Sequence, residues 1–401
     1  MLKKIHVRDI RLGMYVQELC GNWMDHPFWK SSFKLSEPRD LTNLRECGIQ
    51  EVWIDIDKGL DVKPVAPVAT EGVAKVEAVV PPPASEKKRS RPVALHEEIQ
   101  RAEKLYARAQ KTVASIFNES RLGNALATGE TVALVDEITL SVTRNSSALL
   151  SLTRFKDRDN LSYQHSLAVS ILMIALGRQM GLQENVLRSL GVAGLLHDVG
   201  KMMIPAEIQN KPGKLNDHER RIMQTHPVRG RELLKQHPDA DEIVLDVCLH
   251  HHERMDGAGY PEKLAGANIS QYARMAAICD AYDDLTSVSS YKKSLEPAVA
   301  IRKMSDTQSG HLDPAIFHAF VKAVGIYPAG TLVKLKSGRL AVVTDQSAKS
   351  LLAPVVKVFF STRVNEPIIP ELVDLSKVPD EIANVEDPVN WKFDIRVMAG
   401  I

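Results

Sequence analysis

The sequence predicts a mainly α-helical protein that carries a small β-containing domain at each end. Apolar residues recur at helical spacing through residues 151–327. Residues 1–62 and the tail from residue 328 instead alternate short apolar stretches with turn residues, as strands do. The 401 residues allow two or three folding units, and a hydrophobic content of 44% is enough to build a core in each.

The first domain, residues 1–62, is predicted to be small and α+β or β-rich. Its strand-like runs are IHVRDI, MYVQEL and EVWIDI, with Gly13 and Gly21 as turn residues. We interpret its aromatic residues as core rather than as a ligand-binding box: Trp23, Phe28, Trp29 and Phe33.

Residues 63–94 have the composition of a linker, since they are rich in Pro, Ala and Val and include Pro81–Pro83. The linker also holds four basic residues, Lys87, Lys88, Arg89 and Arg91. These would suit a nucleic-acid or lipid patch, but a solvated tether is the favoured interpretation. Residues 95–150 then show the spacing of one or two amphipathic helices, which either pack on the next domain or pair across a homodimer.

The central domain, residues 151–327, is predicted to be helical near residues 163–180, 185–198, 216–235, 241–252, 270–285 and 296–305. The third of these helices begins at a capping box, in which Glu219 follows Asn216 by three residues. Residues 328–401 form a β-rich appendage, with strands in GTLVKLKSG, RLAVVTD and VVKVFFSTRV.

Charge and composition exclude several classes of function. Lys and Arg number 51 against 50 Asp and Glu, so no global positive field would hold DNA, RNA or an anionic membrane. The four cysteines form no C-x-x-C pair, which argues against a zinc ribbon or a disulfide framework. No apolar run approaches the ~20 residues of a membrane span, so a cytoplasmic location is expected.

Histidine is concentrated in the central domain. Eight of the 13 histidines lie between residues 165 and 252. A single helical histidine is more often a satisfied side chain than a ligand, but several of these stand in apolar helices beside aspartates. In VAGLLHDVGK, His197 and Asp198 end an apolar helix, and Gly200 is expected to stop that helix. The candidate ligands are His165, His197, Asp198, His226, His251, His252 and Asp280.

Imidazole and carboxylate ligands without thiolate suit iron, manganese, zinc or another divalent first-row ion. Asp198 has two oxygens and could bridge two cations. Two ions about 3.5–4 Å apart can share a bridging hydroxide and clamp a phosphoryl oxygen. Lys201, about one helical turn past His197, would neutralise charge on the phosphorus. The predicted reaction is therefore hydrolysis of a phosphodiester.

The motif HHERMDGAGYP at residues 251–261 resembles the H-H-E-x-x-D-G-x-G-Y-P signature of the HD-GYP domain family. LLHDVGKMMIP, NKPGKLNDHE, THPVRG and ARMAAICDAYDDLTS follow in the order that this family shows. The resemblance covers about 175 of the 401 residues. It implies a helical HD-superfamily fold and the metal-dependent hydrolysis of cyclic di-GMP to pGpG, with a further step to GMP left open.

The resemblance also implies residue roles. The first metal would take His165, His197, Asp280 and the bridging Asp198, and the second would take Asp198, His226, His251 and His252. Two divalent ions, iron or manganese, are the expected cofactors. Lys201 would touch the scissile phosphate, and Asp283 would support a ligand. Gly257, Tyr260, Lys292 and Lys293 are the candidate substrate contacts.

The loop DGAGYP is expected to turn sharply, with Gly257 and Gly259 supplying backbone angles that other residues resist. Tyr260 would shape the pocket lip or serve the loop's structure alone. In the family this loop is connected to docking of diguanylate cyclase (GGDEF) domains, so such domains are candidate partners. His250 precedes the motif and is expected to be a bystander.

The sequence departs from the family pattern at two places. Members with a third metal have a glutamate where this chain has Leu161, so a binuclear centre is predicted. Many members have Arg-Pro where this chain has Ser289 and Ser290, which removes a phosphate contact. Two alternative functions follow: a module that binds a cyclic dinucleotide without turnover, or a phosphodiesterase for another nucleotide such as cyclic GMP-AMP.

Overall fold

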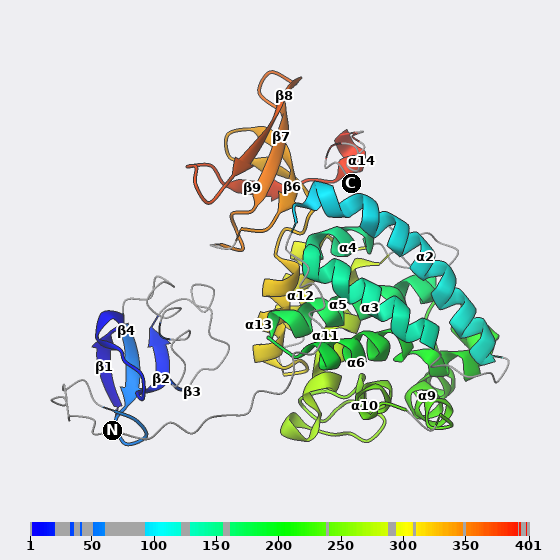
Figure 1. Cartoon of the computed structure of the whole chain (residues 1–401). Coiled ribbons are helices and arrows are strands. Elements are labelled where there is room, and N and C mark those ends of the chain that lie inside the picture. Colours follow the sequence, from blue (N-terminus) through cyan, green and yellow to red (C-terminus); the bar gives the residue numbers. More distant parts are fainter. Residues whose placement is uncertain are drawn as a thin grey trace, which may run out of the picture. The chain divides into compact units, whose positions relative to one another are not determined.

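The computed structural model forms two compact units, Met1–Arg89 and Ser90–Ile401, which are described separately (Figure 1). Among the residues that it describes, no helix is long and apolar enough to cross a membrane. The described residues are 2–20, 33–35, 41, 51–60, 93–121, 129–154, 161–237, 240–287, 294–307, 310–347, 350–391, 393 and 398.

The first unit contains a four-stranded antiparallel sheet with the strand order β1-β4-β2-β3. The strands are β1 (Leu2–His6), β2 (Tyr15–Cys20), β3 (Phe33–Lys34) and β4 (Glu51–Asp55). A small apolar cluster that includes Ile10, Met14, Val16 and Ile54 packs the sheet, in agreement with a small β-rich domain. Trp23, Phe28 and Trp29 lie outside the described residues, as does the side chain of Phe33.

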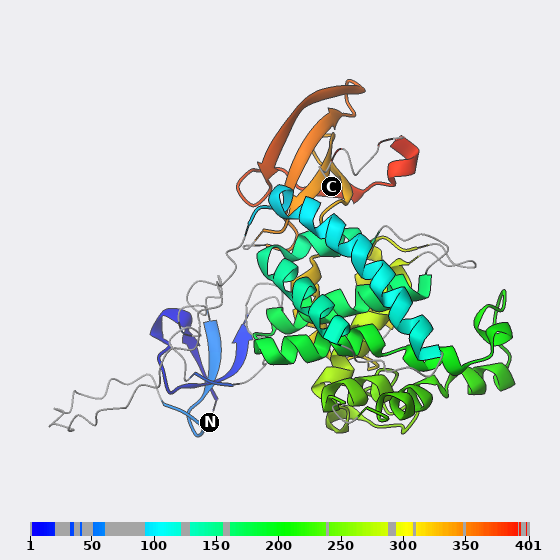
Figure 2. The same ribbon diagram turned by 45° about the vertical axis from the view of Figure 1, so that its right-hand side comes forward.

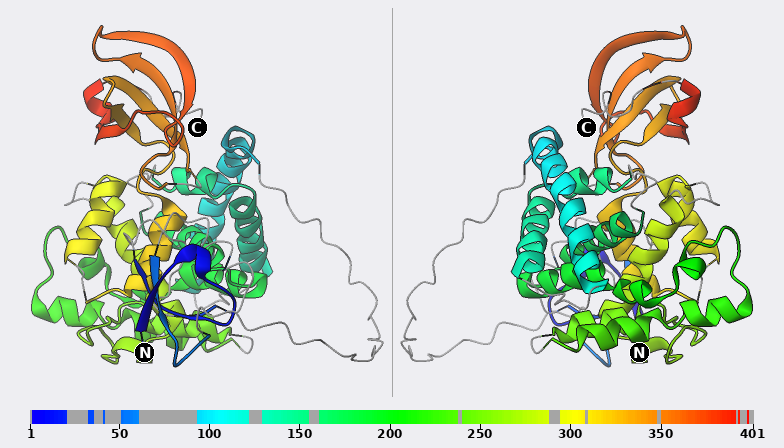
Figure 3. Two further views of the ribbon diagram at one scale, coloured as in Figure 1. Left: turned by 90° about the vertical axis from the view of Figure 1, so that its left-hand side faces the viewer. Right: turned by 90° about the vertical axis from the view of Figure 1, so that its right-hand side faces the viewer.

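The second unit is a helical body with a sheet at one end (Figures 2 and 3). Its helices are α2 (Leu95–Arg121), α3 (Gly129–Arg144), α4 (Ser146–Leu152), α5 (Leu161–Gln179), α6 (Glu184–Leu196), α7 (Ala206–Gln209), α8 (Asp217–Met223), α9 (His226–Leu234), α10 (Glu242–His250), α11 (Gln271–Thr286), α12 (Pro297–Thr307), α13 (Pro314–Val324) and the short α14 (Pro388–Trp391). The mainly helical fold that the sequence predicts is therefore confirmed.

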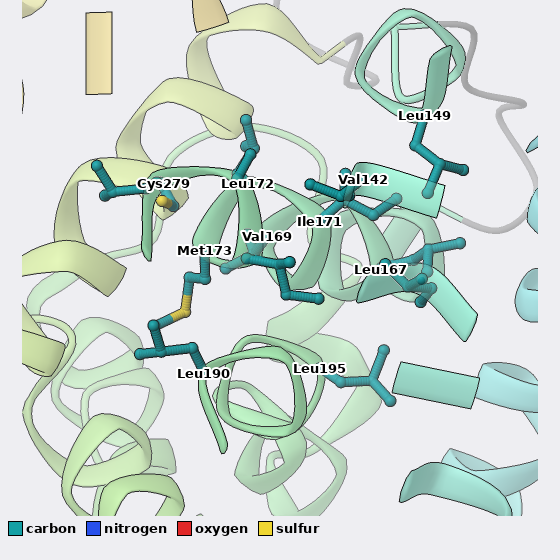
Figure 4. Close-up of a cluster of buried hydrophobic side chains, with 14 of the residues drawn as sticks. Val142, Leu149, Leu167, Val169, Ile171, Leu172, Met173, Leu190, Leu195 and Cys279 are labelled. Carbon is teal, nitrogen blue, oxygen red and sulfur yellow. The ribbon is translucent and has the colours of Figure 1, made fainter. Parts of the chain in front are cut away.

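Helix α5 lies in the centre of this body, and its side chains are apolar on nearly every face. Leu167, Val169, Ile171, Leu172 and Met173 are all buried, and Figure 4 shows them pointing to different sides of the helix. Such all-round burial is typical of a central helix. Because α5 begins at Leu161, His165 lies in its second turn, at the end of the helix that leads into the site.

Helices α5 and α6 approach closely because small residues face each other. A Cβ added at Gly194 would lie 2.7 Å from Cα of Ser170, which leaves no room for a side chain. The hydroxyl of Ser170 donates a hydrogen bond of 2.7 Å to the carbonyl oxygen of Gly191. This contact fixes the end of α6, and with it His197 and Asp198, against α5.

The stretch 216–235 forms two helices instead of the one predicted. The capping box is confirmed: the Asn216 side chain accepts from the Glu219 N–H, and the Glu219 side chain accepts from the Asn216 N–H. Helix α8 nevertheless ends at Met223, and α9 starts at His226 with Pro227 in its first turn. Proline lacks an N–H and disfavours helix in the residue before it, so it marks a new start.

Three helices fill residues 95–152, where one or two were predicted. They share one apolar core with α5 and α6, so they belong to the helical body itself. A buried carboxylate also joins them: Glu98 on α2 accepts hydrogen bonds from Ser141 (2.8 Å) and from Arg144 (2.6 and 2.7 Å) on α3. Helix α13, which was not predicted, starts at the N-cap Asp313 followed by Pro314.

The C-terminal sheet has five antiparallel strands in the order β8-β7-β6-β5-β9. They are β5 (Leu332–Leu335), β6 (Arg339–Asp345), β7 (Val355–Ser361), β8 (Glu366–Asp374) and β9 (Ile382–Val385). Arg154, just after α4, joins the sheet to the helices, because its guanidinium donates to Thr331 (3.1 Å) and to Glu296 (3.3 Å). The predicted β appendage is confirmed, with β8 and β9 added.

Candidate metal centre

Three candidate ligands gather where α5, α6 and α11 meet. His165 lies on α5, His197 is the C-cap residue directly after α6, and Asp280 lies in the middle of α11. Their ligand atoms all lie within 4.8 Å of one another. Nε2 of His165 is 3.1 Å from Oδ1 of Asp280, and Nε2 of His197 is 3.9 Å from the same oxygen. The arrangement suits a cation placed between two imidazoles and a carboxylate.

Four further candidates form a second group beside the first: Asp198, His226, His251 and His252, again with ligand atoms within 4.8 Å. His226 begins α9, while His251 and His252 follow the last turn of α10. Nε2 of His226 lies 3.4 Å from Nε2 of His251. Two imidazole nitrogens that face each other at this distance would suit a shared cation.

Asp198 stands between the two groups and turns one oxygen to each. Its Oδ1 lies 3.2 Å from Nε2 of His226 and 3.6 Å from Nε2 of His251. Its Oδ2 lies 3.4 Å from Nε2 of His197 and 3.6 Å from Nε2 of His165. A single carboxylate can therefore serve both groups, as its place after His197 in the sequence suggested.

Four of the five histidines have Nδ1 held by an acceptor on the protein. Nδ1 of His165 is 2.6 Å from Oδ2 of Asp283, and Nδ1 of His197 is 2.8 Å from the carbonyl oxygen of Gly194. The equivalent acceptors are carbonyl oxygens of Met223 for His226 and of Val247 and Cys248 for His251. Such bonds fix the tautomer with the proton on Nδ1 and leave the lone pair of Nε2 free, which is typical of metal-binding histidines.

Electrostatics keep both carboxylates ionised, although Asp198 is buried and Asp280 is partly buried. Burial alone would raise the pKa of Asp198, but the charge of Lys201 and the contact with His197 hold that pKa well below its usual value. The pKa of Asp280 is lowered in the same way, since its hydrogen bond with His165 outweighs burial. Burial opposes protonation of His165, yet Asp280 and Asp283 raise its pKa to about 10.

The donor set fits divalent metal ions. Nε2 of His197 and Oδ1 of Asp198 are buried, and neither makes a hydrogen bond to any of the described residues. Burying such polar atoms without partners is costly, and a cation at each group would satisfy both. The structure and the ligand chemistry together indicate two sites for divalent metal ions.

Lys201 lies beside the shared carboxylate. It belongs to the short 3₁₀ helix η3 (Val199–Met203), and its ammonium group donates a hydrogen bond to Oδ2 of Asp198. Burial would lower the pKa of Lys201, but the charge of Asp198 raises it above its ordinary value. The side chain is therefore a cation at neutral pH.

The prediction that Gly200 stops the preceding helix is wrong, because α6 already ends at Leu196 and Gly200 lies inside η3. The residue is needed for a close approach. A Cβ at Gly200 would lie 1.9 Å from the carbonyl oxygen of His226 and 2.5 Å from the backbone nitrogen of Gly230. This contact brings α9, and with it His226, against the segment that carries Asp198 and Lys201.

The loop after the paired histidines turns at Gly257, whose φ is +75° and thus favours glycine, as predicted. Gly259 was expected to act in the same way, but it has no such angle. It is constrained by space, since its Cβ would lie 2.5 Å from both the backbone nitrogen of Arg254 and Cα of Glu253. The ring of Tyr260 stacks on that of His252, with centroids 4.7 Å apart.

The remaining residues singled out from the sequence either belong to neither ligand group or fall outside the described part of the chain. Nδ1 of His250 is 2.8 Å from Asp246, and this histidine belongs to neither ligand group, so it is a bystander as expected. Lys292, Lys293, Ser289 and Ser290 lie outside the described residues, and so does the side chain of Leu161. Sequence reasoning gave no role to Glu253, although the H-H-E motif contains it.

Comparisons with known proteins agree with this architecture. Residues 2–131 match the model "Domain of unknown function (DUF3391)", and residues 149–316 match the model "HD domain". A cyclic di-GMP phosphodiesterase of Pseudomonas aeruginosa is 50% identical over 396 residues, which are 98% of this chain and 94% of that protein. The 3'3'-cGAMP-specific phosphodiesterase 1 of Vibrio cholerae is 34% identical over 178 residues, which are 44% of this chain and 41% of that protein.

Among solved structures, an HDG"Y"P protein from Bdellovibrio bacteriovorus matches with a TM-score of 0.47 and 16% identity, over 80% of this chain and 99% of that one. The helical fold and the paired His/Asp groups define a metal-binding HD-domain protein. With its motif and its half-identical relative, the chain belongs to the HD-GYP family, and it carries an N-terminal DUF3391 domain.

Proposed function

We propose that this chain is a phosphodiesterase that hydrolyses cyclic di-GMP to pGpG. The supporting observation is the placement of Asp198, whose two oxygens face two separate groups of imidazoles. The Pseudomonas relative, a cyclic di-GMP phosphodiesterase, supports the choice of substrate because the likeness extends over nearly the full length of both chains.

Each group of residues has a separate task in this proposal. His165, His197 and Asp280 hold one divalent ion, His226, His251 and His252 hold the other, and Asp198 serves both. When bound, two such ions supply Lewis acidity to phosphoryl oxygens and lower the pKa of water. We propose iron or manganese, since both accept imidazole and carboxylate ligands.

Lys201 supplies a fixed positive charge next to the ligand groups. Because the pKa of Lys201 is raised, the side chain acts as a cation that stabilises the developing charge on phosphate, and not as a general base. Asp283 orients His165 through Nδ1. Gly257, Lys292 and Lys293 remain the proposed substrate contacts on the basis of the motif.

The test is turnover by purified protein loaded anaerobically with Fe²⁺ or Mn²⁺, with pGpG and GMP separated by chromatography. The matched control is Asp198→Asn, which keeps the shape of the side chain and removes its charge. We expect pGpG from the wild type and none from the variant. Equal product from both, or intact substrate in both, would contradict the proposal.

A second candidate is hydrolysis of a different cyclic dinucleotide. The Vibrio relative acts on 3'3'-cGAMP, and Ser289 and Ser290 replace a family arginine and proline in this chain. Rates on cyclic di-GMP and 3'3'-cGAMP, measured side by side, discriminate between the two. Tight calorimetric binding of either nucleotide without product over hours would instead indicate a regulatory module.

Partners other than the nucleotide are proposals from the sequence alone. The motif loop is the candidate surface for diguanylate cyclase (GGDEF) domains, and a homodimer is the candidate assembly. Sedimentation of the purified chain, alone and with such a domain, tests both.

A further inference from the structure

His252 differs from the other four histidines of the centre in how its ring is held. Those four have Nδ1 within hydrogen-bond distance of a carbonyl or carboxylate oxygen, at 2.6–3.1 Å. Within the described part of the chain, neither ring nitrogen of His252 makes a hydrogen bond, and Nδ1 lies 3.9 Å from the nearest oxygen of Asp280. The close contacts that the described residues make with its ring are of another kind.

Aromatic rings supply these contacts. The ring of Tyr260 stacks on His252, with an interplanar angle of 27° and centroids 4.7 Å apart. The ring of His251 packs on it with centroids 4.1 Å apart, and the ring of His226 meets it edge-on at 5.0 Å. The backbone also joins the two partners, because the N–H of Tyr260 donates to the carbonyl oxygen of His252 at 3.3 Å. Tyr260 thus contributes a flat ring that stacks on a candidate metal ligand.

A buried glutamate holds the loop that carries Tyr260. Glu253 is only 3% exposed, and each of its carboxylate oxygens accepts a backbone N–H from the far side of the loop. Oε1 accepts from Glu262 at 2.7 Å, and Oε2 accepts from Leu264 at 3.1 Å. Because Glu253 directly follows His252, these two hydrogen bonds hold the end of the loop, at Glu262 and Leu264, against its beginning. The close approach at Gly259 completes this closure.

We propose that Tyr260 is a positioning residue for His252, and that Glu253 keeps Tyr260 in place. The stack fixes the plane of the imidazole and hence the direction of its lone pair, the task that hydrogen bonds perform for the other histidines. The proposal rests on the metal centre described under the proposed function. It gives the glutamate and the tyrosine of the H-H-E-x-x-D-G-x-G-Y-P motif one joint structural task.

The alternative is that Tyr260 contacts the substrate. The two roles predict different measurements. If Tyr260 is a positioning residue, its removal weakens the affinity of one metal site, and excess metal restores the activity of the variant. A substrate contact affects KM, leaves metal affinity unchanged, and is not rescued by metal.

The experiment is calorimetric titration of the metal-free full chain with Mn²⁺ alone, for the wild type, Tyr260→Phe and Tyr260→Leu. We expect two sites in the wild type. Tyr260→Leu keeps an apolar side chain but removes the ring. We expect it to lower the Mn²⁺ affinity of the site that contains His252 about 10-fold and to leave the affinity of the other site unchanged. Phe keeps the ring and should retain both affinities.

A companion pair tests Glu253. Glu253→Gln preserves the shape but leaves one of the two loop N–H groups facing an amide NH₂, so the same metal site should weaken, by less than in Tyr260→Leu. The control is Glu262→Gln, whose exposed carboxylate contacts His250 at 3.4 Å. That variant should bind Mn²⁺ as the wild type does.

Each contrary result is distinct. Unchanged affinities in Tyr260→Leu, equal weakening in Tyr260→Phe, or equal loss of both sites would overturn the positioning role while the metal centre stands. A raised KM that excess Mn²⁺ does not restore would establish the substrate role instead. Failure of the wild type to bind Mn²⁺ at all would overturn the proposed centre itself.

Discussion

The ammonium group of Lys201 donates a hydrogen bond to Oδ2 of Asp198, the same oxygen that faces His165 and His197. A cation held by those two histidines would compete with the ammonium group for this oxygen. The pair therefore places a positive charge beside the residues that would hold the first metal ion, where it would stabilise charge on a phosphate.

Replacing Lys201 with Met tests that charge. We expect kcat to fall about 100-fold, because one charge-stabilising group is lost from the transition state. Metal content should not fall, because the variant removes a competitor for Oδ2 of Asp198. Steady-state kinetics and elemental analysis check the two parts. Lys336→Met is the control, since this lysine pairs with Glu381 in the C-terminal sheet; unchanged kcat in Lys201→Met would contradict the assigned role.

Asp283→Asn tests the orientation of His165. The carboxylate lies 2.6 Å from Nδ1, and weakening this contact should lower metal affinity at the first group by about 10–100-fold. The control is Asp246→Asn, which alters the same kind of contact to His250, at 2.8 Å, a histidine outside both groups. Titration with Mn²⁺ measures both variants. Equal Mn²⁺ affinities for Asp283→Asn and the wild type would show that Asp283 does not position His165.

Gly200→Ala tests the packing of η3 against α9. Its Cβ would meet the carbonyl oxygen of His226 at 1.9 Å, so one segment must move. We expect a loss of about 1–3 kcal/mol in the free energy of unfolding, as overpacking usually causes, together with weaker metal binding at the His226 group. Gly129→Ala, where no atom lies within 4 Å of the new Cβ, should change stability by less than about 0.5 kcal/mol.

Urea unfolding measures both glycine variants. Equal free energies of unfolding for Gly200→Ala and Gly129→Ala would contradict close packing at Gly200.

Arg144→Met tests how the connector helices are joined. The change removes the close guanidinium partner of Glu98, which is fully buried and keeps only the longer ion pair to Arg101 (3.8 Å), and we expect a loss of about 3 kcal/mol in the free energy of unfolding. Arg108→Met removes an ion pair with Glu137 in which both side chains are about half exposed, and should cost less than about 1 kcal/mol. A similar shift of the urea midpoint in both variants would contradict this.

The sequence located the elements that carry the candidate site more closely than some of the others. Candidate ligands that the motif order suggested, such as His165 and Asp280, lie together in the structure, and helical periodicity located α5, α6, α10 and α11 within a few residues. The division of α8 from α9 was missed although Pro227 signalled it, because the apolar period continued across the break. Helix α13 was also missed, despite the cap at Asp313.

Other features depend on contacts between distant segments. Gly200 matters because Gly230 lies against it, and nothing local to either residue announces this approach. The two acceptor bonds of Glu253 likewise appear only once the loop closes. Sequence spacing gives the type of a residue and its place on an element, whereas such contacts come from tertiary packing.

The most direct test of the proposed metal centre is anomalous diffraction from crystals of the metal-loaded protein. We expect two peaks about 3.5–4 Å apart, one on each side of the Asp198 carboxylate, with His197 at one and His226 at the other. A single peak, or a site that stays empty in excess Mn²⁺ and Fe²⁺, would contradict the shared-carboxylate centre.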